Sequence, residues 1–226
     1  RKVGLVCHEW QKTTKKRLQD CFSTDIILKM QNKSITDNYI SVFSIAVRNG
    51  ALPSLRILNL GRNQIYCTGI TALASAVANG ALPSLTTLNL SSNQIGCAGI
   101  TALASAVDNG ALARLKRLSL RDNRIGDVGI SALATAAGNG ALVSLQKLWL
   151  GKNRIGDDGV ATLAKAVGNG ALPSLTELHL NSNAFGDTGL VVFANAIGSG
   201  ALPLLTFLDI GDVDVSAFAV AMGRGA

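Results

Sequence analysis

Few side chains in this 226-residue sequence are suited to catalysis. There are two histidines, His8 and His179, and neither has a candidate partner near it in the sequence. No nucleophile–base motif, phosphate-binding glycine loop or H-E-x-x-H zinc motif is present. We therefore expect a protein that is not an enzyme and needs no cofactor.

The cysteines are also few: Cys7, Cys21, Cys67 and Cys97. Four cysteines in a chain of this length are not a disulfide scaffold, and they fit a reducing compartment. Cys67 and Cys97 are thirty residues apart, but two ligands do not make a zinc site. We expect free thiols, no bound metal and an intracellular, cytoplasmic protein.

The aromatic and basic side chains of the sequence are better suited to binding a protein than to catalysis. Trp149 and His179 are thirty residues apart, and so are Arg117 and Lys147. Tryptophan and arginine are the residues most enriched in binding hot spots. The predicted partner-binding residues are Trp149, His179, Arg117, Arg121, Lys147 and Lys152. The alternative is a solvated surface on which neighbouring alkyl chains partly cover Trp149.

The spacing of these residues belongs to a repeat of thirty residues. The phrase L-x-x-L-x-L-x-x-N-x-I starts at Leu55, Leu85, Leu115 and Leu145. It recurs at Leu175 with Phe185 in the last position, and at Leu205 as L-x-x-L-x-I without the asparagine. A degraded copy starts at Asp25, with Lys33 in the asparagine position. A period of this length indicates a solenoid of stacked units, here about seven of them.

Each unit predicts one strand and one helix. The L-x-L core alternates with period two, which favours a short parallel strand. Residues 100–107 then carry apolar side chains at helical spacing. Asp127, Asp157 and Asp187 precede such runs and are expected to cap the helix that follows. Gly80 and Gly140 are expected to end helices in a left-handed conformation.

These features resemble the ribonuclease-inhibitor-like class of leucine-rich repeat, over residues 25–226. The resemblance rests on the sequence motif N-x-I-G-D-x-G and on the strict period of thirty residues. The resemblance implies an α/β solenoid, a horseshoe arc with parallel strands on its concave face and α-helices on its convex face. It also implies a buried ladder of asparagine side chains that bind backbone groups of neighbouring turns. The residues in that column are Asn63, Asn93, Asn123, Asn153 and Asn183.

The side chains that flank the inward leucines should face outward on the concave sheet. One such column reads Asn59, Asn89, Ser119, Trp149, His179, Asp209, and another reads Ile57, Thr87, Arg117, Lys147, Glu177, Phe207. The face is basic in the middle and acidic toward one end, which predicts an acidic or mixed-charge protein partner. The net charge of +7 is too diffuse to indicate nucleic acid. No run of about 18 apolar residues predicts a membrane span.

Both ends depart from the repeat. Residues 1–24 predict an amphipathic helical cap, but Val6, Cys7 and Trp10 also resemble the V-C-x-x-W end of an F-box. The last unit, 205–226, is shortened and predicts a degenerate cap. The alternative is an array that continues beyond Ala226.

The leading functional hypothesis is a non-catalytic interaction module or scaffold that binds a protein through its concave sheet. Two other hypotheses stay open: a substrate receptor of an F-box ubiquitin ligase, and a structural subunit of a large assembly that packs through its small, uncharged convex side chains. A more remote one is a GTPase activator, because activators of the Ran GTPase share this repeat class. The chain is expected to be a monomer or a subunit of a larger complex.

Overall fold

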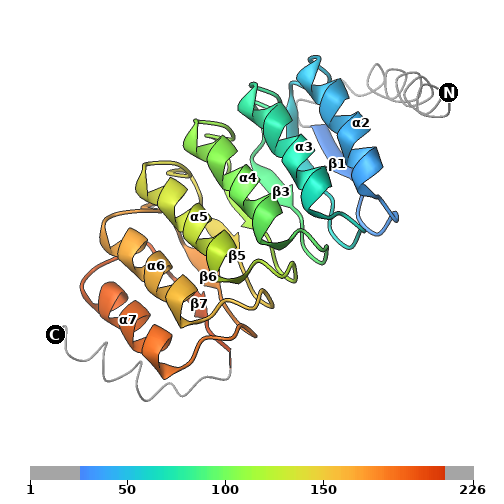
Figure 1. The fold of residues 1–226 in the computed structure, drawn as a ribbon. Coiled ribbons are helices and arrows are strands. Elements are labelled where there is room, and N and C mark those ends of the chain that lie inside the picture. The colour runs from blue at the N-terminus through green and yellow to red at the C-terminus, as the bar shows by residue number, and fades with distance from the viewer. Residues whose placement is uncertain (1–25, 212–226) are drawn as a thin grey trace.

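The structure is a computed structural model that describes residues 26–211. Within this range, strands and helices alternate along the chain and form two layers (Figure 1). The strands are β1 (Ile26–Lys29), β2 (Leu55–Asn59), β3 (Thr87–Asn89), β4 (Arg117–Ser119), β5 (Lys147–Trp149), β6 (Glu177–His179) and β7 (Phe207–Asp209). The helices are α2 (Asp37–Arg48), α3 (Cys67–Ala78), α4 (Gly96–Asp108), α5 (Gly126–Gly138), α6 (Asp157–Gly168) and α7 (Asp187–Gly198).

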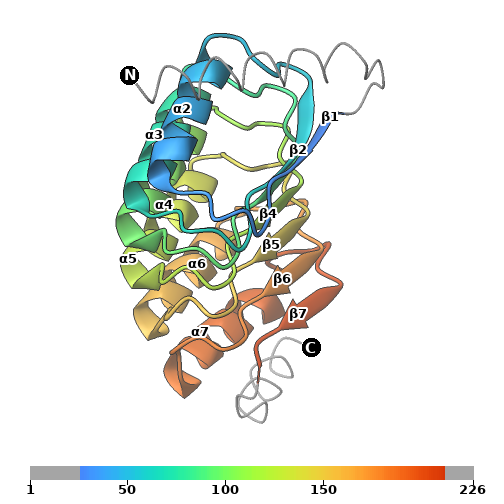
Figure 2. The same ribbon diagram turned by 90° about the vertical axis from the view of Figure 1, so that its right-hand side faces the viewer.

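The strands make one parallel sheet in chain order, from β1 to β7. Figure 2 shows the strands in one layer and the helices in the other. Each helix returns the chain to the start of the next strand, so every strand pairs with its neighbour in the repeat. The predicted α/β leucine-rich-repeat solenoid, with strands on the concave face and helices on the convex face, is confirmed.

The leucines of the repeat fill the space between the layers. One inward leucine from each of five successive strands pairs in register with the next, and none of the five is more than 2% exposed. They are Leu58, Leu88, Leu118, Leu148 and Leu178. Each buried leucine contributes about 1.5–3 kcal/mol. A slip by one residue would turn this column toward solvent, so burial fixes the register that orders the concave face.

The helices end as the glycines predict. In α3, the N–H of Gly80 donates to Val77 O (3.0 Å) and the N–H of Ala81 to Ala76 O (3.2 Å). Gly80 has φ +82°, which a residue with a Cβ adopts only at a cost. The same pair of bonds recurs at Gly50, Gly110, Gly140, Gly170 and Gly200.

The helix starts differ from the prediction. The carboxylates of the aspartate column do not cap their own helices. Instead, Asp127 Oδ1 accepts from the N–H of Gly156 (2.6 Å), just before the helix of the next repeat. Asp157 Oδ1 does the same for Gly186 (2.8 Å) and Gly189 (3.0 Å). These aspartates therefore cap the following helix and join consecutive repeats.

Where the aspartate is replaced, the backbone changes. Cys67 and Cys97 occupy the aspartate position in two repeats, and both are exposed free thiols. In the repeats that follow them, Gly96 (φ +66°) and Gly126 (φ +63°) are left-handed. Their N–H groups donate to the backbone oxygens of Asn123 and Asn153, respectively, at 2.9 Å each. Gly156, which follows an aspartate, is extended with φ −95°. The residue at this position in one repeat thus correlates with the backbone conformation at the start of the next helix.

The asparagine column forms a continuous set of hydrogen bonds, called here the asparagine ladder. Asn153 is fully buried, and its Nδ2 donates to Leu120 O and Leu150 O (2.9 Å each) and to Gly151 O (3.3 Å). Its Oδ1 accepts from the N–H of Asn123 at 2.9 Å. Equivalent Nδ2 bonds are made by Asn63, Asn93, Asn123 and Asn183. The ladder satisfies the backbone at the turn where the chain leaves the sheet.

The predicted cap over residues 1–24 and the F-box-like residues Val6, Cys7 and Trp10 lie outside the described residues. Of the last unit, 205–226, the structure describes β7 and the residues around it, up to residue 211.

Candidate functional site

The parallel register places the predicted recognition residues side by side on the concave face. Trp149 on β5 pairs with His179 on β6, and His179 pairs with Asp209 on β7. In the neighbouring column, Lys147 lies between Arg117 and Glu177. The two columns therefore have the order that the thirty-residue period predicts.

Three rings form an aromatic cluster: Trp149, His179 and Phe207. The rings of Trp149 and His179 meet edge to face, with centroids 5.7 Å apart. The rings of His179 and Phe207 are 5.0 Å apart. Trp149 is 37% exposed and Phe207 51% exposed, so two large apolar side chains face solvent from a rigid sheet. Phe207 was missed as a site residue, although it belongs to the same outward column as Lys147.

Glu177 organises the residues around the aromatic cluster. Its Oε1 accepts from Trp149 Nε1 at 2.9 Å and lies 2.8 Å from His179 Nε2. Its Oε2 forms an ion pair with the ammonium of Lys147. On the other side of the ring, His179 Nδ1 lies 3.2 Å from Asp209 Oδ2. Both nitrogens of His179 thus face carboxylate oxygens, and a neutral ring can donate to one of them at a time.

The same contacts keep Glu177 charged. The hydrogen bond from Lys147 is the main cause of the shift. Burial opposes it with the next largest effect, and the hydrogen bonds from His179 and Trp149 act in the same direction as that from Lys147. Together they lower the pKa of Glu177 from 4.5 to about 2. The carboxylate is therefore negative at neutral pH and fixes the orientation of three of its neighbours.

The other predicted cations are arranged differently. Arg121 Nη1 reaches over Gly151 to Asn181 Oδ1 at 3.4 Å. A Cβ on Gly151 would meet both side chains, at 2.4 Å from Asn181 Oδ1 and 3.0 Å from Arg121 Nη1. Arg117 and Lys152 are exposed. Lys147 differs from them because its ammonium forms an ion pair with Glu177. This ammonium is therefore less available to a partner than the sequence alone indicates.

Within residues 26–211, no cluster of three or more histidine, cysteine or acidic side chains is arranged to hold a metal ion. None of the helices in the same range is both long enough and apolar enough to cross a membrane.

Comparison with known proteins identifies the repeats. A family model described as "Leucine Rich repeat" matches residues 51–74, 81–104, 114–134, 142–164 and 171–194, together about half of the chain. Among solved structures, the chain is similar to an internalin from Listeria monocytogenes, with 20% identity and a TM-score of 0.39. That match covers 76% of this chain and 51% of the internalin chain, so the chain spans about half the length of that relative. No curated protein gives a significant match.

Proposed function

The chain belongs to the leucine-rich repeat family, and from this premise we propose that it is a non-catalytic module that binds a protein partner across its concave sheet. The observation that carries the proposal is the pair of exposed aromatic side chains, Trp149 and Phe207, held on either side of His179. Aromatic residues are enriched in protein interfaces, and tryptophan is enriched among their hot spots. Because the strands beneath them are fixed, little conformational freedom is lost on binding.

The charges of the concave face support an acidic or mixed-charge partner. In the two outward columns, strands β2 to β5 carry Arg117 and Lys147 and no carboxylate. The carboxylates Glu177 and Asp209 lie on β6 and β7, and both contact His179. A partner with acidic groups facing β4 and apolar groups facing β5 to β7 would complement this distribution.

The helical face supports the same choice of surface. Its predicted outward residues Thr71, Ser75 and Ala78 are exposed, small and uncharged. Small side chains rarely carry much binding energy. The full helix in each thirty-residue unit supports membership of the ribonuclease-inhibitor-like class, and the exposed thiols of Cys67 and Cys97 support a reducing, cytoplasmic location.

The test is partner capture by the tagged full chain in its native cell. The test variant combines Trp149→Ala with Arg121→Glu. Its control combines Val128→Ala with Lys165→Glu, which truncates one exposed apolar residue and reverses one charge on the helical side. Loss of a hot-spot residue weakens binding by about 30-fold or more, so a stoichiometric partner should be lost from the test variant and kept by the control. Full capture by the test variant contradicts the proposal.

A further inference from the structure

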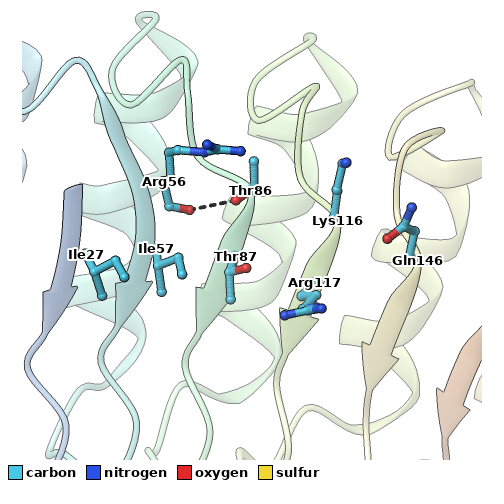
Figure 3. A pocket seen from close by; sticks show the side chains of 8 residues that line it. All are labelled: Ile27, Arg56, Ile57, Thr86, Thr87, Lys116, Arg117 and Gln146. Atoms are coloured by element: carbon cyan, nitrogen blue, oxygen red, sulfur yellow. Dashed lines mark hydrogen bonds between the residues drawn. The ribbon is translucent and has the colours of Figure 1, made fainter. Parts of the chain in front are cut away.

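A second feature of the concave face lies at the amino ends of its strands. A hollow of about 230 Å³ opens there across β1 to β5 (Figure 3). We call it the basic hollow, and its lining residues are Ile27, Arg56, Ile57, Thr86, Thr87, Lys116, Arg117 and Gln146. A hollow of this volume, open to solvent on one side, can take one or two side chains of a ligand whose main chain runs over the sheet.

The lining changes in character from one end to the other. Ile27 on β1 is 48% exposed, and Ile57 on β2 lies beside it in register. Two strands further on, Lys116 and Arg117 are both exposed. Figure 3 shows Arg56 on β2 extending toward Thr86, between these two ends. Among residues 26–211, the lining contains three cations and no carboxylate.

The backbone groups at this edge already form hydrogen bonds with neighbouring strands. The N–H of Thr86 donates to Arg56 O (2.9 Å), that of Lys116 to Thr86 O (2.8 Å), and that of Gln146 to Lys116 O (2.8 Å). The hydroxyl of Thr86 also donates to Arg56 O at 3.0 Å. A ligand here cannot join the sheet as an added strand, so it must cross the strands and be held by their side chains.

We propose that the basic hollow binds an extended acidic segment of the protein partner, with an apolar side chain on Ile27 and Ile57 and carboxylates at Lys116 and Arg117. This inference rests on the proposed function and specifies the chemistry of the partner. Charge complementarity selects an acidic segment. The described part of the lining offers no aromatic ring on which the bases of a nucleic-acid strand could stack.

The geometry also sets the spacing within the segment. Ile57 and Arg117 are two strands apart, on β2 and β4. Neighbouring strands are about 4.8 Å apart, so the two positions are separated by about 10 Å. An extended chain advances about 3.3 Å per residue. The first carboxylate should therefore follow or precede the apolar residue by about three positions.

The test uses fluorescein-labelled peptides and the purified full chain. Two probes cover the two chain directions, Gly-Ser-Leu-Ser-Ser-Glu-Glu-Ser-Gly and Gly-Ser-Glu-Glu-Ser-Ser-Leu-Ser-Gly. For each probe, two control peptides replace both glutamates by glutamine or the leucine by serine. Binding is measured by fluorescence anisotropy at about 0.05 M and about 0.3 M salt, because screening weakens ion pairs between exposed charges. The test variant is Lys116→Gln with Arg117→Gln. The control, Arg124→Gln with Arg154→Gln, removes the same charge from exposed residues beyond the carboxyl ends of the strands.

One of the two probes should bind the wild-type chain and lose affinity by about tenfold or more in the test variant. The control variant should change the affinity of that probe by less than about twofold. The glutamine peptide should not bind, and the serine peptide should bind more weakly. Equal losses in both variants, equal binding of the glutamine peptide or no binding of either probe would overturn the proposal. Self-association that light scattering detects, and that the test variant removes, would assign the hollow to a second copy and overturn it too.

Partner capture separates the two proposals. If Trp149→Ala with Arg121→Glu loses the partner but Lys116→Gln with Arg117→Gln keeps it, the concave sheet binds the partner and the basic hollow does not. If both variants keep the partner, the proposed function itself fails.

Discussion

Replacing Asn153 by alanine tests whether the asparagine ladder stabilises the solenoid. The side chain is fully buried and makes four hydrogen bonds with backbone groups. Truncation leaves the N–H of Asn123 without its acceptor, Asn153 Oδ1. The three carbonyls that lose Nδ2 each keep another donor: Leu120 O from Asn123 Nδ2, Leu150 O from Asn183 Nδ2, and Gly151 O from the N–H of Asp122.

The expected loss follows from this difference. A buried N–H without an acceptor costs about 1–3 kcal/mol, and a hydrogen bond to a carbonyl that keeps a second donor contributes about 0.5 kcal/mol, the low end of the usual range. The free energy of unfolding should therefore fall by about 3 kcal/mol. For a chain of this size that corresponds to a decrease of about 6–12 °C in the thermal midpoint.

Chemical denaturation followed by circular dichroism measures the change. Asn169→Ala is the matched control, because Asn169 is an exposed residue at the end of α6. The control should change stability by no more than about 0.5 kcal/mol. Equal effects of the two substitutions would refute the structural role assigned to the ladder.

Two further predictions concern the backbone and the charge network. In thermal unfolding, Gly126→Ala should lower the free energy of unfolding by about 1–2 kcal/mol more than Gly186→Ala does. Neither added Cβ meets an atom within 4 Å, but only Gly126 is left-handed, with φ +63° against −109° for Gly186. Equal decreases would contradict the reasoning. Glu177→Gln should lower stability at pH 7 by about 1–2 kcal/mol, because the carboxylate accepts charge-assisted bonds from Lys147. Since the folded-state pKa of Glu177 is about 2 and its usual value 4.5, the stabilisation is present above pH 4.5 and is lost as the pH falls toward 2. The difference between wild type and variant should therefore shrink over that range, and a constant difference would contradict the role of the charge.

The fold was predictable because the leucine period is strict. Each inward leucine selects one face of its strand, and the unbroken period of thirty residues brings equivalent leucines into register, as at Leu58 and Leu88. The glycine turns were predictable for a related reason: the left-handed conformation of Gly80 is favourable only without a Cβ.

The start of each helix could not be predicted in the same way. Asp127 lies in the first turn of its own helix, which favours a cap on that helix. Its carboxylate instead binds Gly156, twenty-nine residues later. Which helix the carboxylate caps depends on how closely α5 and α6 approach each other. The local sequence around Asp127 contains no information on that distance. The pairing of Cys97 with a left-handed Gly126 follows from the same contact between repeats.

The candidate site was predictable by column and unpredictable in its contacts. Alternation along the strands placed Trp149, His179 and Lys147 on one face. The central position of Glu177 depends on side-chain orientation across two strands, β5 and β6, since one carboxylate contacts Trp149, His179 and Lys147 together. The available signal was that Glu177 and Lys147 have opposite charge and occupy adjacent positions in one column.

Photo-crosslinking tests the central claim, binding through the concave face, most directly. Benzoylphenylalanine replaces Phe207 on the concave face in one protein and Val192 on α7 in another; the native side chains are 51% and 40% exposed. The partner captured by the wild-type chain is then irradiated with each protein. Crosslinks from position 207 and none from position 192 are predicted. Crosslinks from position 192 alone would contradict binding through the concave sheet.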